Sequence, residues 1–540
     1  MQYIISFLVL FFTIVLLSNS VQAENNKRIL RTSFNTEILT LDPAIGYDWA
    51  NYHTIIALGC RLLNIGNDSN TPETMLTPEL ATSYTISEDN KSYIFNLNDS
   101  WRFNNGRLIE AQDVKYSIER ILAKNTNSPG AAFFEGILGY EDFYTGKMSH
   151  IVGIEVLGPH QIKFTLKRPQ VSFLFGLTTN FGIIVPQEEV TKGNFDRYPV
   201  SCGPFMVDSF ENNKLILKAS PYHPKATEQS WDKIIFFLKE NHNRAIIKLL
   251  KGDLDIILSY FTTSRAVNPY NDEELAKRLI QSDGLMLNTI FVAINRNIKP
   301  FDNLKVRKAL NMAVNKKAIQ NIFVGNAVVA TQVLPPNMLG HNPQQTGYPY
   351  DIDQARTLLR EAGYPNGFST ELLVLDEAWI IAVARTIQAS LAEVGIQLTL
   401  KPVNLENFLK LAADPQQAPL VFSEGVAWIA DYPDPSNFYL PLFSVKSTKG
   451  GWNWSFYNNP NTDLLAYNAD AVVDPKLQTQ RSKQWQTVFE QIHDDAAWIP
   501  LYHNQVYILK APDIKIKKGA SPYLNFSAFF SNYYETLYRE

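Results

Sequence analysis

The chain has 540 residues, and 49 Lys and Arg side chains against 53 Asp and Glu side chains give it a formal net charge of −4. A nearly neutral chain without a basic block is not expected to bind nucleic acid. Hydrophobic residues make up 45% and charged residues 19%, which is typical of a globular rather than a disordered protein, and the length predicts more than one lobe.

The N-terminal residues form an apolar segment. Residues 1–23 contain no charged side chain, and residues 4–17 are almost continuously apolar, a run too short to span a bilayer comfortably. Val21, Gln22 and Ala23 then give the small-x-small pattern that precedes signal-peptide cleavage. We therefore predict a signal peptide at residues 1–23, cleaved after Ala23, and a mature protein in the periplasm. An uncleaved N-terminal anchor is the alternative.

Two cysteines, Cys60 and Cys202, are present. No cysteine follows the apolar segment directly, so we expect no lipid anchor. An oxidising compartment would allow the pair to form a disulfide. Two buried free thiols fit the sequence equally well, because the sequence does not give the distance between them.

Alternating strands and amphipathic helices follow along the first half of the chain. Residues 111–122 predict a helix with Val114, Ile118 and Leu122 on one face. Apolar and polar residues alternate over 93–97 and again over 161–167, which predicts two half-buried strands.

The second half gives a β-α-β pattern. Asp351 is a predicted N-cap for a helix that Gly363 ends, and residues 371–375 predict a strand. A second helix is predicted over 380–394 and a second strand over 396–400. Such a unit implies parallel strands covered by helices, so the predicted fold class is α/β.

Catalytic and metal-binding patterns are scarce. The sequence has no phosphate-binding loop, no nucleophile elbow and no pair of histidines three or four residues apart, so we predict no catalytic residue, no metal and no cofactor. The segment 428–435, WIADYPDP, permits three interpretations. Asp431 and Asp434 could be the acid/base pair of a glycoside hydrolase, or Asp431 could hold a cationic ligand beside aromatic walls. A proline-rich turn is favoured by the local residues alone.

The order of motifs along the chain resembles the peptide- and nickel-type solute-binding proteins of ABC importers, solute-binding family 5. This family includes the oligopeptide- and dipeptide-binding proteins, and the likeness extends over nearly the whole mature chain. The motifs that carry it are LDPA at 41–44, PELATSY at 78–84, WRFNNG at 101–106, AQDV at 111–114, SCGPF at 201–205, GDLDI at 252–256, PFDN at 300–303 and VRKAL at 306–310.

The resemblance implies an architecture and a mechanism. Family members have the type II periplasmic binding protein fold, with two α/β lobes that close about a hinge onto a ligand in the cleft between them. Lobe I would comprise residues 24–285 and 499–540, and lobe II residues 286–498, with hinge strands near 286–294 and 499–502. The protein would be a monomeric binding protein rather than an enzyme, and it would deliver peptides to the permease subunits of an ABC transporter in the inner membrane.

The resemblance also implies ligand-binding residues. A W-x-x-D loop in peptide-binding members supplies an aspartate for the ligand's α-ammonium, and Trp428 and Asp431 match it, with Ile429 and Tyr432 beside them. The Ile429 backbone would pair with the peptide as an added strand. Tyr47 and Trp49 follow the LDPA motif, where oligopeptide binders contact the peptide.

One position departs from the family. Some oligopeptide binders carry an arginine three residues before the tryptophan, where it can meet a peptide carboxylate, but this chain has Gly425 there and Glu424 beside it. Either another part of the protein binds the peptide carboxylate, or the ligand is a longer peptide, or it is another solute such as a nickel complex, an opine, an oligosaccharide or a modified peptide. An exported glycoside hydrolase and a periplasmic sensor or chaperone on the same fold are further alternatives.

Overall fold

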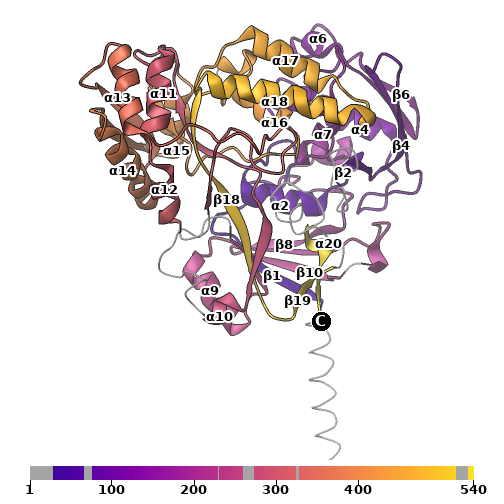
Figure 1. Cartoon of the computed structure of the whole chain (residues 1–540). Helices are drawn as coiled ribbons and strands as arrows, with labels where there is room; N and C mark the ends of the chain where they lie inside the picture. Colours follow the sequence, from indigo (N-terminus) through magenta and orange to yellow (C-terminus); the bar gives the residue numbers. More distant parts are fainter. Residues whose placement is uncertain are drawn as a thin grey trace, which may run out of the picture.

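The computed structural model describes residues 28–65, 76–228, 230–259, 273–323, 327–449, 451–517 and 533–540. The predicted signal peptide lies outside these residues. Within these ranges, no helix is both long and apolar enough to cross a membrane. Three larger sheets organise the chain, and Figure 1 shows them with their helices around the long strand β18 (Trp498–Lys510).

The first sheet has the order β1-β10-β9-β8. Its strands are β1 (Ile29–Ser33), β10 (Lys233–Phe237), β9 (Lys214–Ala219) and β8 (Phe205–Glu211), with β1 parallel to β10 and the others antiparallel. Helix α2 (Trp49–Leu58) packs beside this sheet, and its buried residues share a core with Trp231 and Phe236. Smaller neighbouring elements are β2 (Leu63–Ile65), β3 (Leu76–Pro78), β19 (Ile514–Ile516), α20 (Tyr533–Thr536) and β20 (Leu537–Arg539).

The second sheet is antiparallel, in the order β4-β5-β7-β6. Its strands are β4 (Ala81–Ile86), β5 (Ser92–Leu97), β7 (Gln161–Thr165) and β6 (Ile154–Gly158). Helix α4 (Ala111–Leu122) buries Val114, Ile118 and Leu122 in the core that this sheet forms, which confirms the predicted helix and both predicted strands. The short helices of this part are α5 (Ala131–Phe134), α6 (Tyr140–Tyr144), α7 (Val171–Gly176) and α8 (Gln187–Val190).

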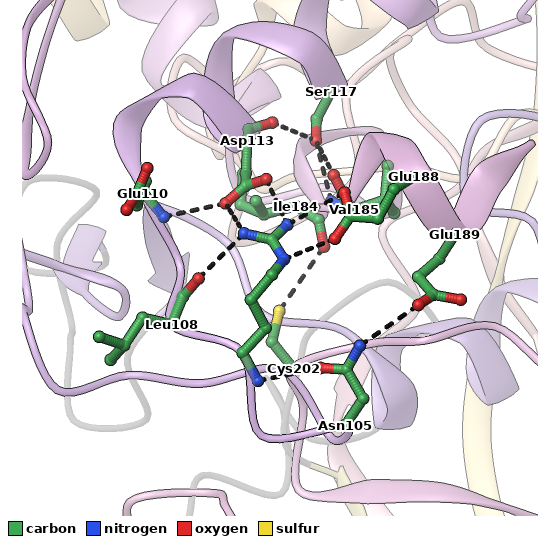
Figure 2. Close-up of polar contacts among 11 residues, drawn as sticks. Asn105, Leu108, Glu110, Asp113, Ser117, Ile184, Val185, Glu188, Glu189 and Cys202 are labelled. Carbon is green, nitrogen blue, oxygen red and sulfur yellow. Dashed lines mark hydrogen bonds and ion pairs between the residues drawn. The ribbon is translucent and has the colours of Figure 1, made fainter.

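The AQDV motif is the start of α4, and Figure 2 shows how it is held. Asp113 accepts the backbone N–H of Glu110 at 2.9 Å, which closes a capping box. The same carboxylate accepts hydrogen bonds from both terminal nitrogens of Arg107, at 3.0 and 2.6 Å. The Nε atom of Arg107 lies 2.6 Å from the carboxylate of Glu188. Ser117 Oγ accepts the N–H of Val185 at 2.9 Å. The motif therefore ties the helix to the loop before it and to the segment near α8.

The third sheet has eight strands in the order β11-β18-β13-β17-β15-β16, with β12 and β14 also paired to β18. Beside β18, these strands are β11 (Ile256–Ser259), β12 (Leu279–Leu285), β13 (Ile290–Ile294), β14 (Ala327–Val329), β15 (Ser369–Leu375), β16 (Gln397–Val403) and β17 (Leu420–Phe422). The first residues of β18 pair with β13, and its last residues pair with β11 and β12. One strand therefore belongs to both halves of the sheet.

Helices surround the β13 end of this sheet. They are α11 (Leu304–Ala313), α12 (Lys316–Ile322), α13 (Ile352–Glu361), α14 (Ala378–Ala392), α15 (Leu405–Ala412), α16 (Ser436–Leu442), α17 (Pro460–Asp470) and α18 (Gln478–Asp494). Near β11 lie α9 (His242–Lys251) and α10 (Glu273–Ala276). Figure 1 shows α11 to α15 gathered on one side of β18 and α17 and α18 extending toward the second sheet.

The predicted β-α-β unit is present. Strands β15 and β16 are parallel, with Ser369 opposite Gln397, and α14 connects them. Asp351 caps α13 by accepting the N–H of Gln354 at 2.9 Å, and Gly363 follows that helix with a φ of +90°. The α/β fold class is confirmed.

The cysteines form a disulfide. The sulfurs of Cys60 and Cys202 are 2.09 Å apart and the Cα atoms 5.2 Å apart. The bond joins the end of α2 to the SCGPF turn before β8. Gly203 in that turn donates its N–H to Leu58 O at 2.7 Å, and a Cβ on Gly203 would lie 2.5 Å from the Leu58 carbonyl carbon. The third position of this motif therefore has no room for a side chain.

Candidate ligand-binding site

The loop 428–435 lies between β17 and α16, and the side chain of Asn437 holds it. Asn437 Oδ1 accepts the indole N–H of Trp428 at 3.0 Å and the backbone N–H of Asp431 at 2.9 Å. Asn437 Nδ2 donates to Asp431 Oδ2 at 2.9 Å. One amide therefore sets both the shape of the loop and the direction of the Asp431 carboxylate.

The Asp431 carboxylate is buried, with the residue 1% exposed. Its Oδ1 accepts the hydroxyl of Tyr47 at 2.8 Å, although the two residues are 384 positions apart in sequence. Burial raises the pKa of Asp431 to about 6, against the hydrogen bonds from Asn437 and Tyr47, which lower it. No Lys, Arg or His of the described residues forms an ion pair with it. Such a carboxylate is ready to receive a cationic group.

Aromatic side chains of α2 and the residues before it surround this carboxylate. Tyr52 and Ile56 are buried, and Tyr47, Trp49 and Ile429 pack against them. The Tyr47 ring lies 5.1 Å from Phe181 between centroids, and the Trp49 ring contacts His53 at 4.4 Å. Asp48 begins α2 by accepting the N–H groups of Ala50 and Asn51. The structure thus brings together four of the sequence-predicted residues, Tyr47, Trp49, Ile429 and Asp431.

The backbone of Ile429 already has a partner on one edge. Ile429 forms an isolated antiparallel bridge with Asn288, and Ala430 donates its N–H to Leu287 O at 2.9 Å. The pairing of Ile429 with a peptide backbone stays a prediction.

Trp428 and Tyr432 pack against other aromatic side chains. The Trp428 ring meets Trp452 at 5.8 Å in a T-shaped contact. The Tyr432 ring stacks on Phe175 at 5.2 Å, with an interplanar angle of 11°. Both side chains are nearly fully buried, at 8% and 2% exposed. Their roles as ligand contacts stay predictions, and the geometry gives both a packing role.

Asp434 is the aspartate of a turn. It accepts the N–H and the hydroxyl of Ser436 at 3.0 and 2.6 Å, and its other oxygen lies 2.6 Å from Arg481 Nη1. The carboxylate is fully buried. With its oxygens occupied in this way, Asp434 does not form an acid/base pair with Asp431, which argues against the hydrolase interpretation.

Position 425 is exposed, but its backbone conformation and its neighbours restrict a side chain there. Gly425 has a φ of +84°, and a Cβ there would lie 2.7 Å from side-chain atoms of Ile380 and Leu375. An arginine at this position would therefore be strained, and the ends of the Ile380 and Leu375 side chains would have to move. Glu424 beside it is 2% exposed and accepts the hydroxyl of Tyr502, and burial raises the pKa of Glu424 to about 8.

Sequence reasoning missed Asn437 and Tyr52. Asn437 lies six residues after Asp431, but its sequence neighbours give no sign that its amide holds that carboxylate. Among the residues that the structure describes, no group of three or more His, Cys, Asp or Glu side chains is placed to hold a metal ion.

Comparison with known proteins decides the family. Residues 75–450 match the family model of bacterial extracellular solute-binding proteins, family 5. The chain belongs to this family. It is 28% identical to haem-binding protein A of Haemophilus influenzae, over 82% of this chain and 81% of that protein, and 28% identical to the dipeptide-binding protein of Escherichia coli, over 80% and 82%.

Solved structures give the same fold. The periplasmic binding protein DppA of Helicobacter pylori, in complex with the peptide STSA, superposes with a TM-score of 0.76 at 26% identity and covers 96% of this chain and 100% of its own. This family member therefore has the two-lobed periplasmic binding protein fold. Its family consists of solute-binding proteins and not of enzymes.

Proposed function

We propose that the protein captures short peptides through their free α-ammonium group and delivers them, chemically unchanged, to the permease of an ABC importer. One observation carries the proposal. The Asp431 carboxylate is buried and lacks a cationic partner among the described residues, and an ammonium group in contact with it would restore the charge balance that burial disturbs. The names of the dipeptide-binding relative and of the peptide complex support the same ligand class.

The ligand would lie between the lobes. We place lobe I at residues 24–285 and 499–540 and lobe II at residues 286–498. On these boundaries Tyr47 and Asp431 belong to different lobes, and their hydrogen bond joins the lobes. On these boundaries the chain passes from lobe I to lobe II at Met286, whose N–H donates to the carbonyl oxygen of Asn504 in β18 at 2.9 Å. Closure would then bring the aromatic side chains of lobe I, Tyr47, Trp49 and Tyr52, onto a ligand held by Asp431.

Export and partners follow from the same proposal. The protein would lose residues 1–23, act as a monomer in the periplasm and dock on the permease subunits in the inner membrane. It would catalyse no reaction.

The test compares two forms of one peptide. Ser-Thr-Ser-Ala with a free N-terminus and the same peptide with an acetylated N-terminus are titrated calorimetrically into the native protein and into Asp431→Ala. Loss of a buried charge pair predicts that the substitution weakens the free peptide by about 100-fold or more and the acetylated peptide far less. Asp353→Ala, which changes an exposed aspartate of α13, is the matched control and should leave both affinities unchanged.

Equal losses for the two peptides would contradict the role of Asp431 as the ammonium partner. If neither peptide binds and haemin does, the peptide class is wrong and the family role as a solute-binding protein stands.

A further inference from the structure

A second set of buried polar contacts lies away from Asp431, between α7 and the end of α17. The Asp470 carboxylate is fully buried, and its two oxygens accept the backbone N–H of Ser172 at 2.9 Å and the hydroxyl of Ser172 at 2.8 Å. Arg168 Nη1 lies 3.7 Å from the same carboxylate, and its guanidinium lies 4.2 Å from the centre of the Tyr467 ring. On the proposed boundaries Ser172 and Arg168 belong to lobe I, and Asp470 and Tyr467 belong to lobe II.

This set of contacts is connected to the loop that carries Asp431. Arg481 of α18 is fully buried, and its Nη1 lies 2.6 Å from Asp434 while its Nε donates to Ala469 O at 3.1 Å. Asp434 in turn holds the first turn of α16, from which Asn437 positions Asp431. Arg481 thus links the residue next to Asp470 to the ligand loop, and all of these groups lie within lobe II.

Apolar and exposed contacts join the same two surfaces. The Tyr432 ring, one residue after Asp431, stacks on Phe175 of α7 and meets Phe133 at 6.0 Å. Nearby, Lys446 and Glu135 form an ion pair. In Figure 1, α17 and α18 extend from the third sheet to the region of α7 and α4. The contact between lobes therefore combines a stacked ring, a partly exposed ion pair and the buried Asp470.

Asp470 is the buried carboxylate among these contacts, and its partners Ser172 and Arg168 belong to the other lobe on the proposed boundaries. The two Ser172 donors reach Asp470 only while the lobes are together, because they belong to the other lobe. When the lobes separate, the carboxylate keeps Arg481 near it but loses both Ser172 hydrogen bonds. A contact made in one state alone shifts the equilibrium toward that state, and hydrogen bonds to a charged group are among the stronger ones.

We propose that Asp470 is a latch of the closed form, formed with Ser172 and connected through Arg481 and Asp434 to the loop of Asp431. The inference rests on the proposed function, in that closure is taken to serve ligand capture. Asp470 touches no ligand in this account and is a positioning residue. Its contribution is the same for every ligand, since it changes the closed population and not the contacts to the ligand.

The first experiment needs no ligand. Cysteines replace the partly exposed ion pair, in Glu135→Cys with Lys446→Cys, and a short bismaleimide crosslinks them only when the lobes are closed. The rate of crosslinking is measured in three backgrounds: native, Asp470→Asn and Asp474→Asn, the last changing an exposed aspartate four residues further on. We expect Asp470→Asn to slow crosslinking about fivefold or more by depleting the closed state, and Asp474→Asn to leave it unchanged. Equal rates in all three backgrounds would overturn the latch.

Ser172→Ala is a second, milder variant that keeps the test valid if Asp470→Asn does not fold. It retains the backbone N–H that donates to Asp470 and removes only the hydroxyl. The rate should fall between those of the native protein and Asp470→Asn. If Ser172→Ala crosslinks at the native rate while keeping its native melting temperature, the latch is wrong.

The second experiment separates the latch from the ligand proposal. With free and acetylated Ser-Thr-Ser-Ala, Asp470→Asn should weaken both peptides by one common factor, whereas Asp431→Ala weakens the free form selectively. If Asp470→Asn lowers the affinity for one peptide more than for the other, Asp470 belongs to the ligand site and the latch is wrong. Slower crosslinking without any peptide binding would leave the latch in place and remove the peptide function.

Discussion

The Asp431 carboxylate owes its chemistry to its surroundings. Burial makes its charge costly, and only two neutral side chains, Tyr47 and Asn437, are placed to stabilise it among the described residues. An ammonium ligand would lower the pKa of this carboxyl, because it favours the charged form. Below about pH 6 we therefore expect ammonium binding to be coupled to the release of a proton from Asp431.

Binding of a free-amine peptide should depend on pH in one direction. With the pKa of Asp431 near 6 in the free protein, the carboxylate is charged above that pH, and binding is expected to be constant up to about pH 7, where the α-ammonium of the peptide still keeps its proton. Below it the carboxyl is protonated before the ligand arrives, so affinity falls by up to about tenfold per pH unit. Calorimetry from about pH 7 to about pH 4.5 measures this, with the acetylated peptide as the control that lacks the slope. An affinity that rises on acidification would contradict the assignment.

The buried Glu424 carboxyl should make the stability of the protein depend on pH. Its pKa of about 8 in the folded protein lies above its ordinary value of 4.5, so between these values the folded state binds more protons than the unfolded state. The contribution of Glu424 to the free energy of unfolding is therefore present at low pH and is lost as pH rises toward 8, by on the order of 5 kcal/mol at most. Glu424→Gln retains an acceptor for Tyr502 and should remove this slope in urea unfolding at pH 5, 6.5 and 8. Glu88→Gln, at an exposed position, should leave the slope unchanged, and parallel profiles for both variants would refute the prediction.

Some of these residues were accessible from sequence and others were not. The WIADYPDP segment directs attention to Asp431 because a motif places an acid beside aromatic residues. The hydrogen bond from Tyr47 and the contact of Asp470 with Ser172 join residues 384 and 298 positions apart, and no local pattern encodes such pairs. From the sequence, Glu424 is interpreted as a negative charge that would repel a peptide carboxylate. In the structure its burial favours the neutral form.

At the scale of elements, the β-α-β unit is predictable because its apolar spacing is regular. Strand β15 begins at Ser369, two residues before the predicted strand, since backbone pairing with β16 extends beyond the apolar residues. Strand β18 is the element that sequence describes least well. The predicted hinge segment covers only residues 499–502, but the strand continues to Lys510 because it pairs with a second set of strands.

The SCGPF turn allows a test of one glycine. A Cβ on Gly203 would meet the backbone of Leu58, which cannot move without disturbing the end of α2 and the disulfide next to it. Gly203→Ala should therefore destabilise the protein by about 1–3 kcal/mol, as overpacking does. Gly193→Ala, with no atom within 4 Å of the added carbon, is the matched control and should be neutral. Thermal and urea unfolding of both variants measure the difference, and an equal response would show that the close contact is unimportant.

At the scale of the whole molecule, the proposed capture of a ligand depends on two lobes that meet over it. The order of motifs predicts the family and its fold, because each motif fixes a local turn or cap such as the start of α4. The contacts that hold the lobes together are formed by tertiary structure alone, so only the folded chain reveals them. The Tyr47–Asp431 hydrogen bond, the Asp470 latch and the Glu135–Lys446 ion pair are polar contacts that we expect closure to make and opening to break.

The most direct test of the central claim is to identify what the protein carries. The protein is purified from the periplasm of its own cells without added ligand, denatured, and the released small molecules are analysed by mass spectrometry. The account predicts a set of short peptides with free N-termini, absent from Asp431→Ala prepared in the same way. A single non-peptide species, or peptides retained equally by the variant, would contradict it.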